Sequence, residues 1–370
     1  MTKKIFYAAS SLIIASFAGV FIYYAYIRDI ENQPLAPSNL YTSLMNTNPA
    51  FIEGEQLAKA GNQRGAVAAY EKALLLVANK LEEGQIKNKI ATALAASGDV
   101  SRAITLSKEV VVDEAYGAIP RAYAARFLGQ LLISPWFAAK YTEIQKEIFK
   151  DEPYKGLASS TDASVSIRNL FDYSASIYPL AYSELRSARW YVNVIFALKQ
   201  KSTQNATDKE KIKEYLQIIA EKVRLADADI ARVKETENEN LVLPNTFSEK
   251  ALIHARLTRV KESYSGMASP ESVYDEALVY VRFKNMTEGE ASLQYSYAIY
   301  LARENVNKKG TEINALLSDF YTSERFAQTS TMYMFTHEEL DSPATKEDVR
   351  LLASIDSGFK TFLQKNGWKF

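Results

Sequence analysis

The sequence predicts an all-α protein, with one transmembrane helix at the N-terminus followed by stacked antiparallel helix pairs. Three observations support this. Residues 5–27 form an apolar run without a charged side chain, and two helical hairpins with small residues at equivalent places lie between Phe51 and Val111. Gly and Pro number only 14 and 10. Alternating patterns of β-branched residues, which indicate strands, are few.

The composition excludes several functional classes. Lys+Arg and Asp+Glu number 44 each, so the chain lacks the basic excess typical of nucleic-acid binding, and we expect no nucleic-acid partner. There is no cysteine, which excludes disulfides, thiolate zinc sites, iron–sulfur clusters and a cysteine nucleophile. Hydrophobic residues make up 47% of the chain, which is enough for a large core.

The apolar run at residues 5–27 is long enough to span a membrane. At ~1.5 Å per residue a helix of this length covers about 34 Å, against ~30 Å for the hydrocarbon core. Lys3 and Lys4 precede the run, whereas Asp29 and Glu31 follow shortly after it. The positive-inside rule therefore predicts a cytoplasmic N-terminus and an extracytoplasmic location for the bulk of the chain.

We expect a single-pass protein of a bacterial inner membrane, attached through this N-terminal helix. A cleaved signal peptide is the alternative, since Ser16-Phe17-Ala18 weakly fits a small-x-small cleavage site. The predicted organisation is a cytoplasmic N-terminus (1–4), a transmembrane helix (5–27), a tether (28–48), helical repeats (49–118), a diverged helical region (119–236) and a C-terminal helical region (247–366).

The stretch from Phe51 to Val111 contains the same helical hairpin twice. Gly61-Asn62 breaks the first unit, and Gly98-Asp99 breaks the second at an interval of 37 residues. Ala66 and Ala103 then occupy equivalent places in the second helices, where small side chains allow antiparallel helices to touch. A single hairpin cannot bury its own apolar face, so we expect such units to stack.

The two units resemble the tetratricopeptide repeat. The first unit matches the small and large positions of that motif with Gly54, Leu57, Gly61, Ala66, Tyr70, Ala73 and Leu74. The second unit keeps Ala91, Leu94, Gly98, Asp99 and Ala103, but Ser107 replaces an aromatic residue and Val110 an alanine. The resemblance implies a TPR-like α-solenoid whose first helices line a groove that holds a peptide or partner segment. A generic helical bundle is the alternative fold.

By this resemblance, the inward-facing positions of the groove are Asn48, Phe51, Glu55, Ala58 and Lys59 in the first unit and Gln85, Asn88, Thr92, Ala95 and Ala96 in the second. From these positions we select as candidate partner-binding residues Phe51, Glu55, Lys59, Asn88 and Thr92. The groove positions show no strong charge bias. A solvated polar face without a partner is the alternative interpretation.

The middle of the chain is rich in aromatic residues. Tyr182, Trp190 and Tyr191 are candidates for an aromatic cleft that binds a glycan or another small ligand. Aromatic residues at spacings of three and four also pack between helices, and an ordinary core is the competing interpretation.

Ten further helices are predicted from apolar periodicity. They are expected at Pro120–Ile133, Pro135–Phe149, Asp162–Ile177, Leu180–Gln200, Asp208–Lys234, Ser248–Tyr264, Pro270–Phe283, Glu288–Glu304, Thr311–Phe326 and Thr345–Lys365. The helix at Asp208–Lys234 carries a heptad seam, which we expect to pack within the chain. Pairing with a second copy of the chain is the alternative. The stretch Glu237–Thr246 is the best candidate for a domain boundary.

No residue pattern predicts an enzyme. The chain has two histidines, His254 and His337, and neither belongs to a metalloprotease motif. Phosphate-loop and dinucleotide fingerprints are missing, and we predict no catalytic, cofactor or metal residues. The sequence favours a non-enzymatic membrane-anchored scaffold or adaptor that binds a protein or peptide segment. An extracytoplasmic small-ligand or glycan-binding protein is the alternative.

Overall fold

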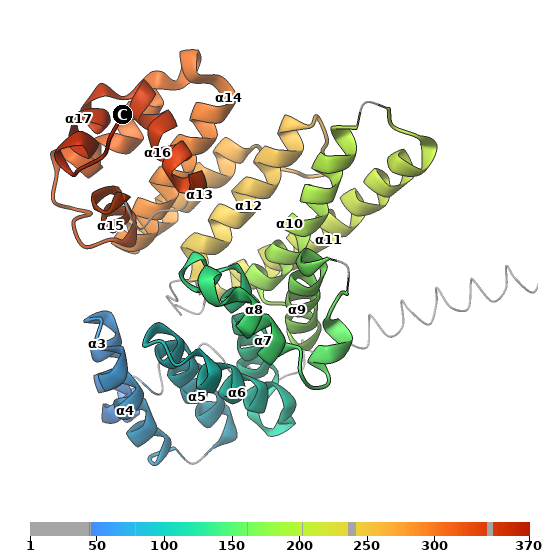
Figure 1. The fold of residues 1–370 in the computed structure, drawn as a ribbon, viewed down its shortest axis with the longest axis vertical. Helices are drawn as coiled ribbons and strands as arrows, with labels where there is room; N and C mark the ends of the chain where they lie inside the picture. The colour runs from blue at the N-terminus through green and yellow to red at the C-terminus, as the bar shows by residue number, and fades with distance from the viewer. Residues whose placement is uncertain are drawn as a thin grey trace, which may run out of the picture.

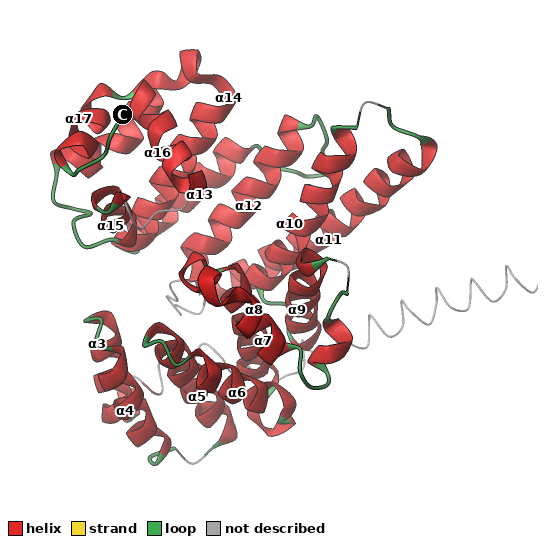
Figure 2. Ribbon diagram, viewed as in Figure 1, coloured by secondary structure: helices red, strands yellow, loops and turns green. Residues whose placement is uncertain are grey.

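The structure is a computed structural model. It describes residues 44, 46–77, 79–160, 162–201, 203–235, 242–338 and 343–370. Over these residues every regular element is a helix, which confirms the all-α fold class (Figures 1 and 2). The predicted transmembrane helix at 5–27 and most of the tether lie outside the described residues. Among the residues that are described, no helix combines the length and apolarity needed to cross a membrane.

The helices follow one another along a curved path, with α7 to α9 at its centre (Figure 1). Its first half comprises α3 (Pro49–Lys59), α4 (Gln63–Leu74), α5 (Lys80–Ala96), α6 (Val100–Val112), α7 (Ala118–Ile133), α8 (Tyr141–Ile148) and α9 (Ala163–Ile177). Its second half comprises α10 (Ala181–Lys199), α11 (Ala206–Glu235), α12 (Val242–Arg259), α13 (Pro270–Phe283), α14 (Thr287–Thr322), α15 (Ser330–Thr336), α16 (Pro343–Ile355) and α17 (Ser357–Lys365). Short 3-10 helices lie at Glu114–Tyr116, Pro135–Lys140 and Tyr154–Leu157.

The pairs α3/α4 and α5/α6 are the two predicted hairpins, and each closes in the same way. The first helix of each pair is followed by a glycine in the left-handed region, Gly61 with φ of 78° and Gly98 with φ of 96°. Only glycine adopts this conformation at little cost, which is why it ends so many helices. The two turns are 37 residues apart, as the sequence predicts.

The residue after each glycine joins the two helices of its hairpin. The amide of Asn62 donates to the carbonyl of Leu57, and that of Asp99 donates to the carbonyl of Leu94, each at 2.9 Å. The side chains of Asn62 and Asp99 then accept a hydrogen bond from the first turn of α4 and α6. The same residue therefore closes one helix and caps the next.

Small residues bring the paired helices close together, as predicted. Ala66 and Ala103 are fully buried. Gly54 of α3 lies against the ring of Tyr70 of α4, and a Cβ atom at position 54 would stand 2.5 Å from two of the ring carbons. The hairpin architecture of residues 49–112 is therefore present in the structure.

Two predicted helices in the C-terminal region are joined into one. Glu288–Glu304 and most of Thr311–Phe326 belong to the single helix α14, which runs through Gly310 without a break and ends at Thr322. The two predicted helices leave residues 305–310 between them, and these residues are helical in the structure. A helix interior tolerates one glycine at a cost of about 1 kcal/mol, and packing against α12, α13 and α16 supplies compensating contacts.

Two other predicted helices are each divided. The segment Pro135–Phe149 begins as the 3-10 helix Pro135–Lys140 and becomes α-helical only from Tyr141. The segment Thr345–Lys365 is interrupted at Asp356, whose carboxylate accepts a hydrogen bond from the amide of Phe359 and caps α17. The hydrogen bond to Asp356 therefore starts a new helix at Ser357, although the apolar pattern of the sequence continues across this position.

The buried hydrophobic residues form two clusters, one from Leu44 to Leu170 and one from Ala181 to Trp368. The heptad helix α11 packs on α10 within the second cluster, as expected. Helix α12 contributes to the same cluster. Residues 237–241 of the predicted boundary lie outside the described residues, and residues 242–246 form the start of α12. The domain boundary itself stays a prediction.

Candidate functional site

The candidate residues of the first hairpin are engaged inside the fold. Phe51 is fully buried, with its ring centre 5.6 Å from that of Tyr70. Glu55 is 7% exposed, accepts a hydrogen bond from the Tyr70 hydroxyl, and lies 2.9 Å from the ammonium of Lys89. These contacts leave neither side chain on an open face. The side chain of Lys59 lies outside what the structure describes.

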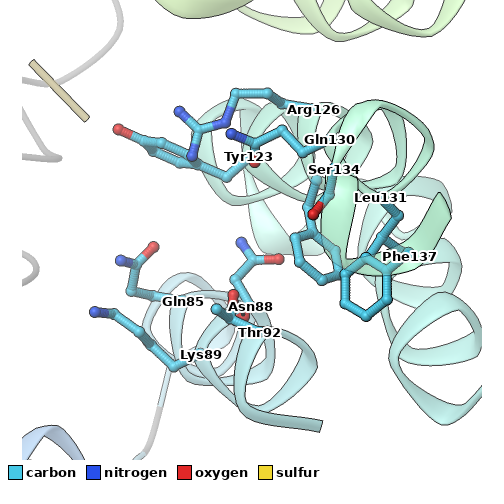
Figure 3. Close-up of a pocket in the computed structure, with 11 residues that line it drawn as sticks. Gln85, Asn88, Lys89, Thr92, Tyr123, Arg126, Gln130, Leu131, Ser134 and Phe137 are labelled. Atoms are coloured by element: carbon cyan, nitrogen blue, oxygen red, sulfur yellow. Dashed lines mark hydrogen bonds between the residues drawn. The ribbon is translucent and has the colours of Figure 1, made fainter. Parts of the chain in front are cut away.

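The candidate residues of the second hairpin line a cavity of about 370 Å³ between α5 and α7 (Figure 3). We call it the α5–α7 cavity. Helix α5 contributes Gln85, Asn88, Lys89 and Thr92, and α7 with the turn after it contributes Tyr123, Arg126, Phe127, Gln130, Leu131, Ser134 and Phe137. The structure thus brings three predicted groove positions, Gln85, Asn88 and Thr92, to one site.

Asn88 and Thr92 are held in place by backbone contacts. The side-chain Nδ2 of Asn88 donates to the backbone carbonyl of Pro120 at the start of α7, at 2.9 Å. The hydroxyl of Thr92 donates to the carbonyl of Asn88, also at 2.9 Å. Asn88 therefore fixes the spacing of α5 and α7. Thr92, which is exposed, forms part of the rim of the cavity.

Arg126 of α7 is the most unusual group of the α5–α7 cavity. It is 9% exposed, and its guanidinium carbon lies 4.5 Å from the ring centre of Tyr123 and 5.9 Å from that of Tyr182. Its buried Nε has no hydrogen-bond partner, and no ion pair joins its guanidinium to any described residue. Figure 3 shows the guanidinium lying over the Tyr123 ring.

The surroundings of Arg126 disfavour its charge. Burial lowers the pKa of its guanidinium, and the neighbouring tyrosines and Asp229 only partly compensate. The carboxylate of Asp229 is already used, because it lies 2.6 Å from Arg232 and accepts a hydrogen bond from the amide of Ala181 at 2.8 Å. Arg126 is thus a buried cation without a counterion among the described residues.

A carboxylate in the α5–α7 cavity would complete this arrangement. A guanidinium binds a carboxylate through two parallel hydrogen bonds, and such bonds are strongest where water is excluded. Sequence reasoning missed Arg126. The available signal was a charged side chain among Ala124, Ala125, Leu128 and Leu131, but the sequence alone does not show whether that charge has a counterion.

The three aromatic candidates pack in two different places. Trp190 and Tyr191 pack with Tyr215, at centroid distances of 5.1 Å for Trp190–Tyr191 and 5.2 Å for Tyr191–Tyr215. The guanidinium of Arg168 lies 4.3 Å from the Trp190 ring centre. Tyr182 packs separately, on Phe171 and Arg126. None of the three lines the α5–α7 cavity.

The described residues offer no cluster of three or more His, Asp or Glu side chains that could hold a metal ion. His254 is buried, and its Nε2 lies 2.6 Å from the hydroxyl of Tyr264. Comparison with protein-family models, with curated proteins and with solved structures finds no match to this chain. Its function must therefore be argued from its own geometry.

Proposed function

We propose that this protein is a non-enzymatic, membrane-anchored scaffold or adaptor. In this proposal, the α5–α7 cavity binds a carboxylate-bearing segment of a partner protein. The observation that carries the proposal is the buried guanidinium of Arg126, which lines the cavity and has no counterion within the described chain.

The chemistry of the cavity favours a peptide over a compact apolar ligand. Asn88, Gln130 and Ser134 add amide and hydroxyl groups beside Arg126, while Phe127 and Phe137 add apolar surface. A peptide offers both a polar backbone and side chains to such a lining. Its carboxylate would offset the desolvation of Arg126, and its backbone would exchange hydrogen bonds with the polar rim.

The arrangement of the helices also supports this proposal. Helix α5 follows the hairpin α3/α4, and α7 follows the hairpin α5/α6. Helices α5 and α7 contact each other directly. In a TPR-like solenoid, such first helices line the inner groove. The proposed family, its groove and its use in protein binding all rest on this resemblance together with the hairpins of α3 to α6.

The membrane attachment in this proposal depends on residues 5–27. Their uncharged apolar sequence suits a spanning helix, and the lysines before it favour a cytoplasmic N-terminus. The repeats would then be held close to the outer face of the membrane, because about twenty residues separate the predicted helix from α3. A partner bound there would be recruited to the membrane surface.

Site-specific photocrosslinking tests the proposal. The full-length chain is produced in its own cells with p-benzoylphenylalanine at Thr92, an exposed residue on the cavity rim. Irradiation should give a covalent adduct with a specific protein. The matched control places the probe at Thr105, an exposed threonine of α6 away from the cavity.

Comparison of the two positions distinguishes binding in the cavity from non-specific crosslinking. We expect the adduct from Thr92 and not from Thr105. Adducts of equal yield with the same proteins from both positions, or no protein adduct from Thr92, would overturn the proposal. The adducted peptide, identified by mass spectrometry, should carry an Asp, a Glu or a free C-terminus.

A further inference from the structure

A second and larger cavity, of about 510 Å³, lies in the C-terminal half of the molecule between α12 and α14. We call it the α12–α14 cavity. Its lining contains four arginines and a single carboxylate, namely Arg189, Arg256, Arg259, Arg303 and Asp348. These residues come from four helices, α10, α12, α14 and α16, so the positive charge is gathered by the tertiary fold and not by one stretch of sequence.

Two of the four arginines already have counterions. Arg189 lies 2.8 Å from Glu249, and Arg303 pairs with Asp348. Glu249 is buried and also binds Arg186 at 2.5 Å, so its one negative charge is shared between two cations. Glu249 and Asp348 are therefore both engaged by arginines already.

The other two arginines, Arg256 and Arg259, lie three residues apart on α12. Arg256 donates a hydrogen bond to the neutral side-chain carbonyl of Asn193. Arg259 lies over the ring of Phe196, with its guanidinium carbon 5.6 Å from the ring centre. Within the described chain neither guanidinium forms an ion pair with a carboxylate.

The cations crowd one another. Burial is the main reason that the pKa of Arg256 falls to about 10, and the positive charges of Arg189 and Arg303 lower it further against the opposing effect of Glu249. Arg256 is therefore a half-buried cation with further arginines close to it. An anion bound in the cavity would relieve this repulsion.

The cavity also has a free hydroxyl and an apolar wall. The Oγ atom of Ser248 is buried and has no hydrogen-bond partner among the described residues, and Ser248 lines the cavity. Leu252 and Ile299 supply aliphatic surface, and the Tyr300 ring lies beside them with its hydroxyl donating to Glu271 at 3.0 Å. Donors and apolar surface therefore occur in one cavity, and its volume suits a small organic molecule.

We propose that the α12–α14 cavity binds a small organic phosphate ester. Arg256 and Arg259 would bind the phosphate, Ser248 would donate to one of its oxygens, and the organic group would lie against Leu252, Ile299 and Tyr300. Guanidinium groups bind phosphate oxygens through paired, charge-assisted hydrogen bonds. This site is separate from the α5–α7 cavity and does not depend on the proposed peptide binding.

A phosphate suits the charges better than a monocarboxylate. One carboxylate carries a single negative charge, whereas Arg256 and the exposed Arg259 both line the cavity without an ion pair to a described carboxylate. A phosphate ester carries close to two negative charges at neutral pH and three acceptor oxygens. It could therefore bridge Arg256 and Arg259 and still accept from Ser248.

Calorimetric titration of the detergent-solubilised full-length protein with phenyl phosphate tests this proposal. Phenyl phosphate should bind, inorganic phosphate should bind more weakly because it lacks the apolar group, and benzyl alcohol should not bind. The double variant R256Q/R259Q should lose about tenfold or more in affinity. The double variant R64Q/R102Q is the matched control, because it removes the same charge from exposed positions on α4 and α6 and should bind as the parent does.

A third variant keeps the test independent of folding defects. Ser248→Ala removes a hydroxyl that has no partner, so it should leave the thermal midpoint unchanged or raise it, while weakening phenyl phosphate binding by about threefold. Absence of phenyl phosphate binding to the parent protein, equal losses in both double variants, or equal affinity for inorganic and phenyl phosphate would overturn the proposal.

Discussion

The ammonium of Lys89 on α5 lies 2.9 Å from the carboxylate of Glu55 on α3, and this ion pair joins the two N-terminal hairpins. The same carboxylate accepts a hydrogen bond from Tyr70 of α4. One buried acidic group thus connects three helices. Glu55 is committed to the fold, which explains why it is not available to anchor a partner as the sequence suggested.

Glu55→Gln should therefore lower stability. The amide keeps the size of the side chain but loses the charge that Lys89 faces, and we expect the free energy of unfolding to fall by about 1–3 kcal/mol. Urea denaturation followed by circular dichroism measures the change. The control is Glu53→Gln, an exposed position of the same helix, which should stay within about 0.5 kcal/mol of the parent. Equal effects of the two substitutions would contradict the structural role of Glu55.

Much of the N-terminal architecture could be predicted from the sequence because it is local. Gly61 and Gly98 mark helix ends through backbone conformation, and Ala66 and Ala103 mark close contacts through side-chain size. Both signals are short-range and repeat after 37 residues. The continuity of α14 through Gly310 could not be predicted, because there tertiary packing outweighs the local signal of the sequence.

The candidate sites were harder to predict. Asn88 and Thr92 line the same cavity because they lie one turn apart on one face of α5, and their role in partner binding stays a prediction. The pairing of Glu55 with Lys89 and the missing counterion of Arg126 depend on which helices meet. So does the collection of Arg189, Arg256 and Arg303 around one cavity. Such contacts between residues far apart in the chain cannot be predicted from a single sequence.

The contact between Gly54 and Tyr70 gives a second stability prediction. Gly54→Ala would place a methyl group 2.5 Å from the ring carbons, so the ring or the helix must move, and we expect a loss of about 1–3 kcal/mol. Gly310→Ala is the control, because no described neighbour lies within 4 Å of its added Cβ. It should raise stability by about 0.5–1 kcal/mol, since alanine favours the helix interior. Thermal denaturation of both variants tests the opposite signs, and a stabilising Gly54→Ala would contradict the packing described for α3 and α4.

The buried His254 should make stability depend on pH. Burial and, to a lesser extent, Lys250 lower its pKa from 6.5 to about 4, so the unfolded chain takes up a proton at higher pH than the folded chain does. Stability contributed by neutral His254 is therefore present above pH 6.5 and is lost as the pH falls towards 4. The loss amounts to about 3 kcal/mol at most.

Denaturation at a series of pH values compares the parent with His254→Asn. The substitution should flatten the dependence between pH 6.5 and 4, even if the variant is less stable at every pH. A variant that keeps the full slope of the parent would show that His254 is not the group responsible.

In the absence of a bound partner, Arg126 should lower the free energy of unfolding of the protein. Arg126→Met keeps an unbranched side chain of similar reach and removes a buried charge that has no counterion. The loss of the cation–π contact with Tyr123 offsets part of the gain. We expect the free energy of unfolding to rise by about 1–3 kcal/mol, the typical cost of an unsatisfied buried group. A clear destabilisation, measured by urea denaturation, would indicate that the charge of Arg126 already has a stabilising partner.

Binding in the α5–α7 cavity is tested most directly by combining this substitution with the crosslinking probe at Thr92. The yield of the partner adduct is compared in the parent, Arg126→Met and Arg126→Lys chains, all produced in the same cells at matched levels. We expect the yield to fall about tenfold with methionine and to be partly retained with lysine, because lysine keeps the positive charge but not the paired hydrogen bonds. An adduct of unchanged yield in the Arg126→Met chain would contradict the binding of a carboxylate at Arg126.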